Sequence, residues 1–313
     1  MAAKLRVGYV PEHFSAPLLQ LLETDKALAE WVELVPNPSG TGQMIAALKD
    51  RSIHLAVALT ESLIAGIILG KGDYKLIGTY VTSPLNWAVI TGANTKYNSI
   101  ADLKGQNMGI SRPGSGSQVM ASVMALQQGW TNTSSSALQF VGLLPSLSKS
   151  LEKSGLSVIS PRPGHPGKKE WNTITLRMPA STSLTQSRHF RRLVGPACKQ
   201  DDPQSVAPEL LAPERLKLFL EKLDASIHKF GTELGIRSSE NVKYIEEKFD
   251  QKEADVKEWM KGVSYPKKTH EISKKTLEET VKDLGLAGVI PDAKGVAIPD
   301  QLVNTEVATV TNS

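Results

Sequence analysis

The sequence predicts an α/β fold with two lobes, and three observations carry that prediction. Short apolar strands alternate with amphipathic helices from residue 5 to about residue 144, a pattern typical of a mainly parallel sheet with helices on both faces. Turns rich in Ser, Gly and Pro separate these strands from the helices that follow them. At 313 residues, the chain is long enough to form two lobes.

The first lobe begins with strands and helices in alternation. Leu5, Val7 and Tyr9 alternate with polar residues or glycine, and this period of two predicts a strand that ends before Pro11. The apolar run LAVAL fits a strand covered on both faces. The expected elements are a strand over 5–9, a helix over 16–30, a strand over 31–35, a helix opened by the turn 36–42, a strand over 55–59, a helix capped by 60–62, and strands over 75–81 and 85–91.

The second lobe is expected to begin near Thr91, after a hinge over 88–92. A short helix over 99–104 stops at Gly105 and leads into a strand over 108–110. A turn of small residues then opens a helix whose apolar residues recur at helical spacing. A strand over 138–144 is the last element that the pattern predicts in this region.

The segment 146–212 departs from this pattern. It is rich in Ser, Pro, Arg and Lys and keeps no sustained period of 2 or 3.6, and a compact domain seldom holds so long a structureless loop. Residues 145–200 carry ten lysines and arginines against two glutamates, a net charge of +8, while the remainder sums to −4. We interpret the segment as foreign to the fold, as an altered reading frame or a mis-assigned exon boundary would produce.

Helical order returns at Pro213, where a stripe of apolar residues runs to Gly231. Further helices are expected over 239–249, 252–261 and 273–284, followed by a surface extension after Pro291. The predicted organisation is lobe 1 over 1–90, lobe 2 over 91–212 with 146–212 atypical and poorly ordered, C-terminal helices over 213–290 that pack on lobe 1, and a tail over 291–313.

The turn after the strand at 108–110 is a candidate half of a binding site. A strand that feeds a helix through a glycine-rich turn leaves backbone N–H groups pointing outward, and these groups favour an anion or a polar ligand together with the helix dipole. A second interpretation stands beside this one: a capped helix with Ser117 as N-cap and glycines that serve turn geometry. The candidate contacts are Ser111, Arg112, Gly114, Ser115, Gly116 and Ser117.

Loops at the carboxyl ends of the first-lobe strands supply the other candidates, because ligands of open α/β sheets bind beyond these ends. A carboxylate or imidazole there would hydrogen-bond a ligand amine or hydroxyl, although Glu61 serves equally well as a partner of its helix dipole. Trp87 either stacks on a flat heteroaromatic ring or is a core residue at the lobe junction. The candidate contacts are Glu12, His13, Ser39, Gly40, Thr41, Thr60, Glu61 and Trp87, of which Ser39 and Thr41 also suit helix caps.

Composition excludes several classes of function. The net charge of +4 comes from one segment rather than from a basic face, and no nucleic-acid motif accompanies it. No run approaches the roughly 18 apolar residues of a membrane span. A single cysteine, Cys198, and scattered histidines argue against a metal site. We therefore expect a cytoplasmic protein without metal, cofactor, nucleic acid or membrane span, either a monomer or a weak dimer.

Several stretches together resemble the type 2 periplasmic-binding-protein-like family. They are RVGYVPEHF, PSGTGQMIAAL, VALTESLIAGI, GTYVTSPLNWAV, IADLKGQNMGISRPGSGS and ERLKLFLEKL. The resemblance covers residues 4–145 and 213–290, and it is to the nitrate/taurine/alkanesulfonate and thiamine-precursor binding subgroup, including a cytosolic fungal branch. It implies two α/β lobes that close about a hinge on a small ligand.

The family's strands and helix are not recognisable over 146–212, so the resemblance implies an incomplete second lobe. Family members that make the thiamine pyrimidine carry a cysteine-rich iron motif, which this chain lacks.

Three functions remain open at this point. The first is a solute-binding protein for a small anionic or heterocyclic ligand, such as a sulfonate or a thiamine-pyrimidine precursor. The second is a thiamine-pyrimidine-synthase-like enzyme on the same scaffold, with His13 and Glu12 or Glu61 transferring protons. The third is a protein that has lost its function. Because no serine has a base and an orienting acid at suitable spacing, no catalytic residue is predicted and binding is the leading hypothesis.

Overall fold

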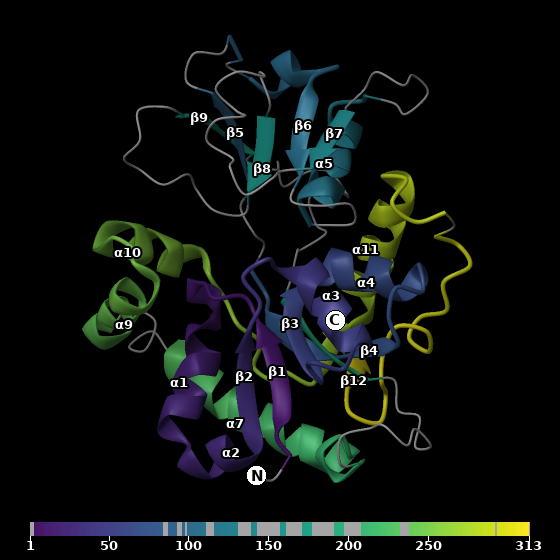
Figure 1. Cartoon of the computed structure of the whole chain (residues 1–313). Coiled ribbons are helices and arrows are strands. Elements are labelled where there is room, and N and C mark those ends of the chain that lie inside the picture. The colour runs from purple at the N-terminus through teal and green to yellow at the C-terminus, as the bar shows by residue number, and fades with distance from the viewer. Residues whose placement is uncertain are drawn as a thin grey trace. The chain divides into compact units, whose positions relative to one another are not determined.

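The computed structural model divides the chain into two compact units (Figure 1). Unit 1 holds residues 1–84, 188–278 and 296–313, and unit 2 holds 85–187 and 279–295. The structure describes residues 3–83, 87–92, 96–97, 99–110, 116–130, 139–142, 157–160, 171–176, 191–196, 208–231, 238–291 and 293–312. Compared with the predicted organisation, unit 1 also takes up residues 188–212 and most of the tail.

Unit 1 is built on a five-stranded sheet in the order β2-β1-β3-β10-β4. Strands β1, β2 and β3 are parallel, whereas β10 is antiparallel to both β3 and β4, so β4 runs in the same direction as β3. The strands are β1 Leu5–Tyr9, β2 Val32–Pro36, β3 Leu55–Leu59, β4 Tyr74–Val81 and β10 Arg191–Pro196. Four of the five strands predicted for the first lobe are therefore in this sheet, with β1 and β3 at their predicted bounds. The fifth, predicted over 85–91, is β5 Trp87–Gly92 and belongs to unit 2.

Helices cover both faces of this sheet. The connection from β1 to β2 and that from β2 to β3 run in opposite directions across the sheet, so right-handed crossovers place their helices on opposite faces. Helix α1 contacts α7 on one face, and α3 contacts α4 on the other (Figure 1). The helices are the short η1 His13–Ser15, α1 Ala16–Thr24, α2 Lys26–Trp31, α3 Thr41–Lys49, α4 Thr60–Ile68, the short η3 Pro208–Leu210 and α7 Pro213–Gly231.

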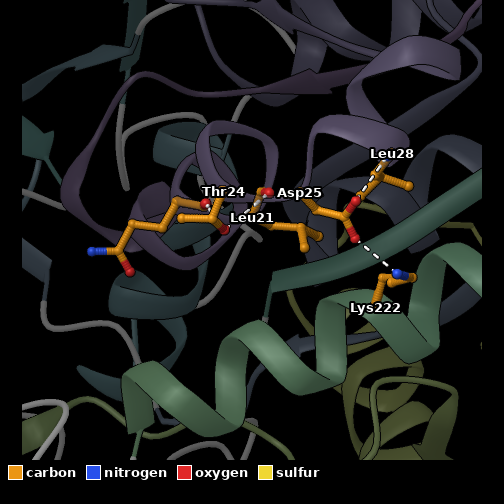
Figure 2. A network of polar contacts seen from close by, with 6 residues as sticks. Leu21, Thr24, Asp25, Leu28 and Lys222 are labelled. Carbon is orange, nitrogen blue, oxygen red and sulfur yellow. Dashed lines mark hydrogen bonds and ion pairs between the residues drawn. The ribbon is translucent and has the colours of Figure 1, made fainter.

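The helix predicted over 16–30 is broken in two at Asp25. The Asp25 carboxylate accepts the backbone N–H of Leu28 at 2.9 Å and the ammonium of Lys222 in α7 at 2.8 Å (Figure 2). These two donors hold the pKa of Asp25 below its usual range. Because the side chain caps α2 in this way, a local N-cap preference overrides the continuous apolar period.

Unit 2 contains a second five-stranded sheet in the order β7-β6-β8-β5-β9. Its strands are β5 Trp87–Gly92, β6 Asn107–Ile110, β7 Gln139–Gly142, β8 Ser157–Ser160 and β9 Trp171–Leu176. The short helix η2 Ile100–Leu103 starts at the capping box of Ser99 and Asp102, and α5 spans Gly116–Gln127. The hinge predicted over 88–92 is wrong, because these residues form β5, which is paired with strands on both sides, and the chain enters unit 2 near residue 84.

The segment 146–212 contributes strands to both sheets, although its sequence keeps no sustained period and shows none of the family's strands. Strands β8 and β9 flank β5 in the sheet of unit 2, and β10 lies between β3 and β4 in unit 1. These strands are only 4 to 6 residues long. Residues 192–195 of β10 are all buried, so the strand shows no alternation of exposed polar and buried apolar positions. The other parts of the segment lie outside the described residues.

The C-terminal helices divide between the two units, since residues 213–278 lie in unit 1 and residues 279–295 in unit 2. Helices α9 Ser239–Phe249 and α10 Glu253–Gly262 share a buried cluster with α1 and α7 that includes Ala16, Phe230, Ile245 and Met260. Helix α11 spans Lys274–Leu286, and β11 Glu271–Ser273 pairs in parallel with β12 Thr309–Thr311.

The tail differs from the predicted surface extension. Leu302 and Val303 are buried, and the carbonyl of Leu302 accepts the N–H of Leu76 at 2.8 Å. The tail therefore covers the outer edge of β4.

The predicted fold class is confirmed: the chain is α/β and has two units. Unit 2 is the less complete of the two among the described residues, since α5 is its one α-helix that lies wholly inside the unit.

Candidate functional site

Four strand-end loops of unit 1 lie at one edge of its sheet. Strands β1, β2, β3 and β4 share one direction, so the residues that follow them emerge at the same edge. We call this edge, with residues 10–13, 37–41, 60–62 and 82–83, the carboxyl edge. Its buried polar side chains are Glu12, Asn37, Thr41, Thr60, Glu61, Ser62 and Ser83.

Hydrogen bonds hold the first of these loops in place. The Ser15 hydroxyl donates to the carbonyl of Val10 at 2.8 Å, and the Ser15 N–H donates to the carbonyl of Glu12 at 2.8 Å. The carbonyl of Phe14 accepts the hydroxyls of Tyr80 at 2.9 Å and Tyr265 at 3.2 Å. A ligand that meets this loop therefore meets a backbone that is already ordered, which lowers the entropic cost of binding.

His13 lies against aromatic side chains of unit 1. Its ring makes an edge contact with Trp259 of α10, with centroids 4.5 Å apart, and lies 4.8 Å from the ring of Phe14. Glu12, the neighbouring candidate, is 5% exposed. The sequence placed both residues at the end of the first strand, but the contact with α10, almost 250 residues away, left no local signal.

In the loop after β2, the candidate residues Ser39, Gly40 and Thr41 take part in the local backbone structure. Gly40 has φ +78° and ψ −159°, a region that residues with a Cβ avoid. The Thr41 hydroxyl accepts the N–H of Leu59 at 3.2 Å, and the N–H of Ser39 donates to the side-chain oxygen of Gln43 at 2.9 Å. The expectation that Ser39 and Thr41 cap the following helix is wrong, because Gly40 is the N-cap of α3 and makes no side-chain bond.

The loop after β3 passes directly into α4. Leu59 is the N-cap, and Thr60, Glu61 and Ser62 form the first helical turn rather than a cap, contrary to the prediction. Glu61 is 4% exposed, and a carboxylate in the first turn is stabilised by the helix dipole. The sequence analysis did not include Ser62 among the candidates. Its position directly after Glu61, at the end of a predicted strand, could have indicated it.

The candidates of unit 2 are described only in part. Gly116 and Ser117 are the first two residues of α5 and both are buried. The interpretation of Ser117 as an N-cap is therefore wrong, since it lies inside the helix. Trp87 is the first residue of β5, but its side chain lies outside the described residues, as do Ser111, Arg112, Gly114 and Ser115.

Strand β10 brings basic residues to the sheet of unit 1 that sequence reasoning did not consider. Arg191 pairs with Leu59 and Val81, the last residues of β3 and β4, so its backbone lies at the carboxyl edge. Arg192 is fully buried and donates to the hydroxyl of Thr79, and burial lowers its pKa to about 9. A strand that returns more than 100 residues after its neighbours gives no local signal of this placement.

A surface groove lies away from the candidate residues. A surface groove of about 670 Å³ is lined by charged side chains of α9 and α10, including Lys243, Glu246 and Lys257. In the described ranges, no three His, Cys, Asp or Glu side chains are placed to hold a metal ion. In the same ranges, no helix is both long and apolar enough to cross a membrane.

Two features define the structural class of this chain. In unit 1, an antiparallel strand from late in the chain lies beside β3, and a second α/β unit accompanies unit 1. This chain has the fold of the type 2 periplasmic-binding proteins, which confirms the predicted resemblance. Residues 87–157 match the family model described as Ca3427-like PBP.

Among solved structures, the chain is similar to the Candida albicans CA3427 gene product, which defines a family with the generic periplasmic-binding-protein fold. The two share 26% identity over 92% of this chain and 91% of that one, with a TM-score of 0.71. The alkanesulfonate-binding protein SsuA of Xanthomonas axonopodis pv. citri, bound to MOPS, shares 12% identity over 99% of each chain with a TM-score of 0.64. No curated protein sequence matches the chain.

Proposed function

We propose that this chain is a solute-binding protein whose two units close on one small molecule. The observation that carries the proposal is the gathering of buried polar side chains at the carboxyl edge, where seven such residues follow four parallel strands. Small-molecule sites use a few closely placed polar groups to orient the ligand, and ligands of open α/β sheets bind beyond the carboxyl ends of the strands.

The proposed ligand is a small anionic or heterocyclic molecule, such as a sulfonate or a thiamine-pyrimidine precursor. The N-terminal turn of α5 favours an anionic or polar group, because its first N–H groups have no partner within the helix. The likeness to SsuA, an alkanesulfonate-binding protein, supports the same class of ligand. In periplasmic binding proteins, closure of two domains about a hinge accompanies binding.

A thermal-shift screen of small anions, sulfonates and pyrimidines tests the proposal. A ligand at 100 times its Kd should stabilise the protein by about 2.7 kcal/mol and raise the melting temperature measurably. Gly114→Val should abolish the shift by blocking close backbone approach. Gly262→Val is the matched control, because a Cβ at Gly262 meets nothing within 4 Å.

If no compound in the screen stabilises the protein, the result favours a protein that has lost its function over a solute-binding protein. Equal shifts in wild type and Gly114→Val would instead contradict the placement of the ligand at this turn. Product formation from thiamine-precursor compounds would favour the enzyme over the binding protein.

A further inference from the structure

Two glutamate side chains are buried in loops that follow neighbouring strands at the carboxyl edge. Glu12 is 5% exposed in the loop after β1, and Glu61 is 4% exposed in the first turn after β3. Strands β1 and β3 are direct parallel neighbours, with Val7 paired to Leu55, so these two loops are adjacent. An ionised carboxylate accepts hydrogen bonds but donates none. The edge therefore presents acceptors at two neighbouring positions.

Ser62 provides an independent sign of a ligand. Its side chain is 2% exposed, and its hydroxyl has no hydrogen-bond partner among the described residues. Because Cα–Cβ bonds in a helix tilt toward the N-terminus, this hydroxyl leans toward the start of α4, where Glu61 lies. A buried hydroxyl usually finds a partner, and a ligand at the carboxyl edge would supply one.

Asn37, Thr41 and Thr82 of the edge make hydrogen bonds within unit 1. The side-chain amide of Asn37 donates to the carbonyl of Val35 at 2.8 Å, and the Thr41 hydroxyl accepts the N–H of Leu59. The hydroxyl of Thr82 lies 3.0 Å from that of Ser264. The charged residues of the four strand-end loops that define the edge are Glu12 and Glu61. His13 is the other titratable residue in these loops. Arg191 is the basic residue whose backbone borders them.

From these observations, and building on the proposed solute binding, we propose that the carboxyl edge recognises an amino or ammonium group of the ligand. Glu12 and Glu61 accept its N–H groups, and Ser62 adds a further hydrogen bond. The ligand is then an amine-bearing small molecule, and its amino group, rather than an anionic group, meets unit 1.

Calorimetric titration with matched probes tests this assignment. Taurine and ethanesulfonate differ by one amino group, as do 4-aminopyrimidine and pyrimidine. The amine-bearing member of a pair should bind at least about tenfold more tightly, because a hydrogen bond to a charged group contributes about 1.5–3 kcal/mol. If none of the four binds, the tightest compound of the thermal-shift screen and its analogue that differs by the amino group form the pair.

Glu61→Gln and Glu12→Gln should each weaken binding of the amine by about tenfold to a hundredfold and leave the amine-free analogue unchanged. Ser62→Ala should weaken it less. Glu33→Gln, at an exposed position of β2, is the matched control and should bind like wild type. Circular dichroism and melting temperatures of the free variants show that each is folded.

The inference is overturned if the tightest ligand lacks an amino group, or if the glutamate variants bind the amine as tightly as wild type. Loss of sulfonate binding in Arg191→Gln, with no effect of Glu61→Gln, would overturn it in favour of an anion at this edge. In each of these outcomes a ligand still binds, so the proposed solute-binding function stands. Failure of every compound to bind contradicts that function itself.

Discussion

His54 links the stability of unit 1 to pH through a single side chain. The imidazole is 6% exposed, and its Nδ1 accepts the N–H of Arg6 at 2.9 Å. Burial lowers its pKa to about 4, and the positive charge of Arg6 acts in the same direction. Below pH 6.5 the unfolded chain binds a proton at this position that the folded chain binds only near pH 4. The free energy of unfolding therefore falls as the pH drops through this window.

His54→Asn should remove this dependence, because the amide oxygen of Asn takes the place of Nδ1 as acceptor. Between pH 6.5 and 4, wild type should lose about 1.4 kcal/mol per pH unit relative to the variant. Urea unfolding of both proteins at several pH values measures the difference. Parallel stability curves would show that burial does not perturb His54.

Arg192 places a positive charge in the middle of a sheet. The side chain is 1% exposed, and the lowered pKa of about 9 means that it is still charged, with its desolvation cost fully present, at pH 7. Arg192→Met keeps much of the volume and removes the charge, so it should raise the free energy of unfolding by about 1–3 kcal/mol. Lys71→Met, at an exposed position, should change it little. A destabilised Arg192→Met would show that the guanidinium contributes more than its desolvation costs.

The packing of β4 requires its backbone at Gly78 to lie very close to the backbone of Thr269, just before β11. A Cβ on Gly78 would lie 2.5 Å from the carbonyl oxygen of Thr269, which accepts the N–H of Thr79 at 2.6 Å. Gly78→Ala should force the two backbones apart and destabilise the protein by about 1–3 kcal/mol. Chemical unfolding monitored by tryptophan fluorescence measures this loss.

The control for Gly78 is Gly231→Ala at the end of α7, where a Cβ meets nothing within 4 Å. That substitution should be neutral or slightly stabilising, because it reduces the freedom of the unfolded chain. Equal stability of Gly78→Ala and wild type would mean that β4 has room to move away from Thr269.

For the whole molecule, the proposed function predicts a change in shape. The chain passes between the units near residues 84, 187, 278 and 295, and closure on a ligand should reduce the radius of gyration. Small-angle X-ray scattering with and without a saturating ligand from the screen measures this change. Gly114→Val with the same ligand should keep the profile of the free protein. Coincident wild-type profiles would contradict closure.

Local sequence patterns predicted most of the secondary structure of unit 1 and the candidate loops. The apolar run of β3 and the alternation in β1 predicted their strands because both patterns are local. The convergence of Glu12, Thr41 and Glu61 at one edge followed from parallel strand direction alone. Cap positions were less predictable, since Ser39, Thr41 and Ser117 suit a cap equally well by residue type.

The placement of segments that are far apart in the chain could not be predicted from local patterns and is seen in the folded structure. Strand β10 lies between β3 and β4, Trp259 packs on His13, and the tail at Leu302 covers β4. Each of these pairings joins residues more than 100 positions apart, so no period within a short window records it. Strands pair through backbone N–H and C=O groups, and every residue except proline carries both, so the backbone does not specify which strands pair. The partner of each strand depends instead on how the side chains of the completed sheet are buried.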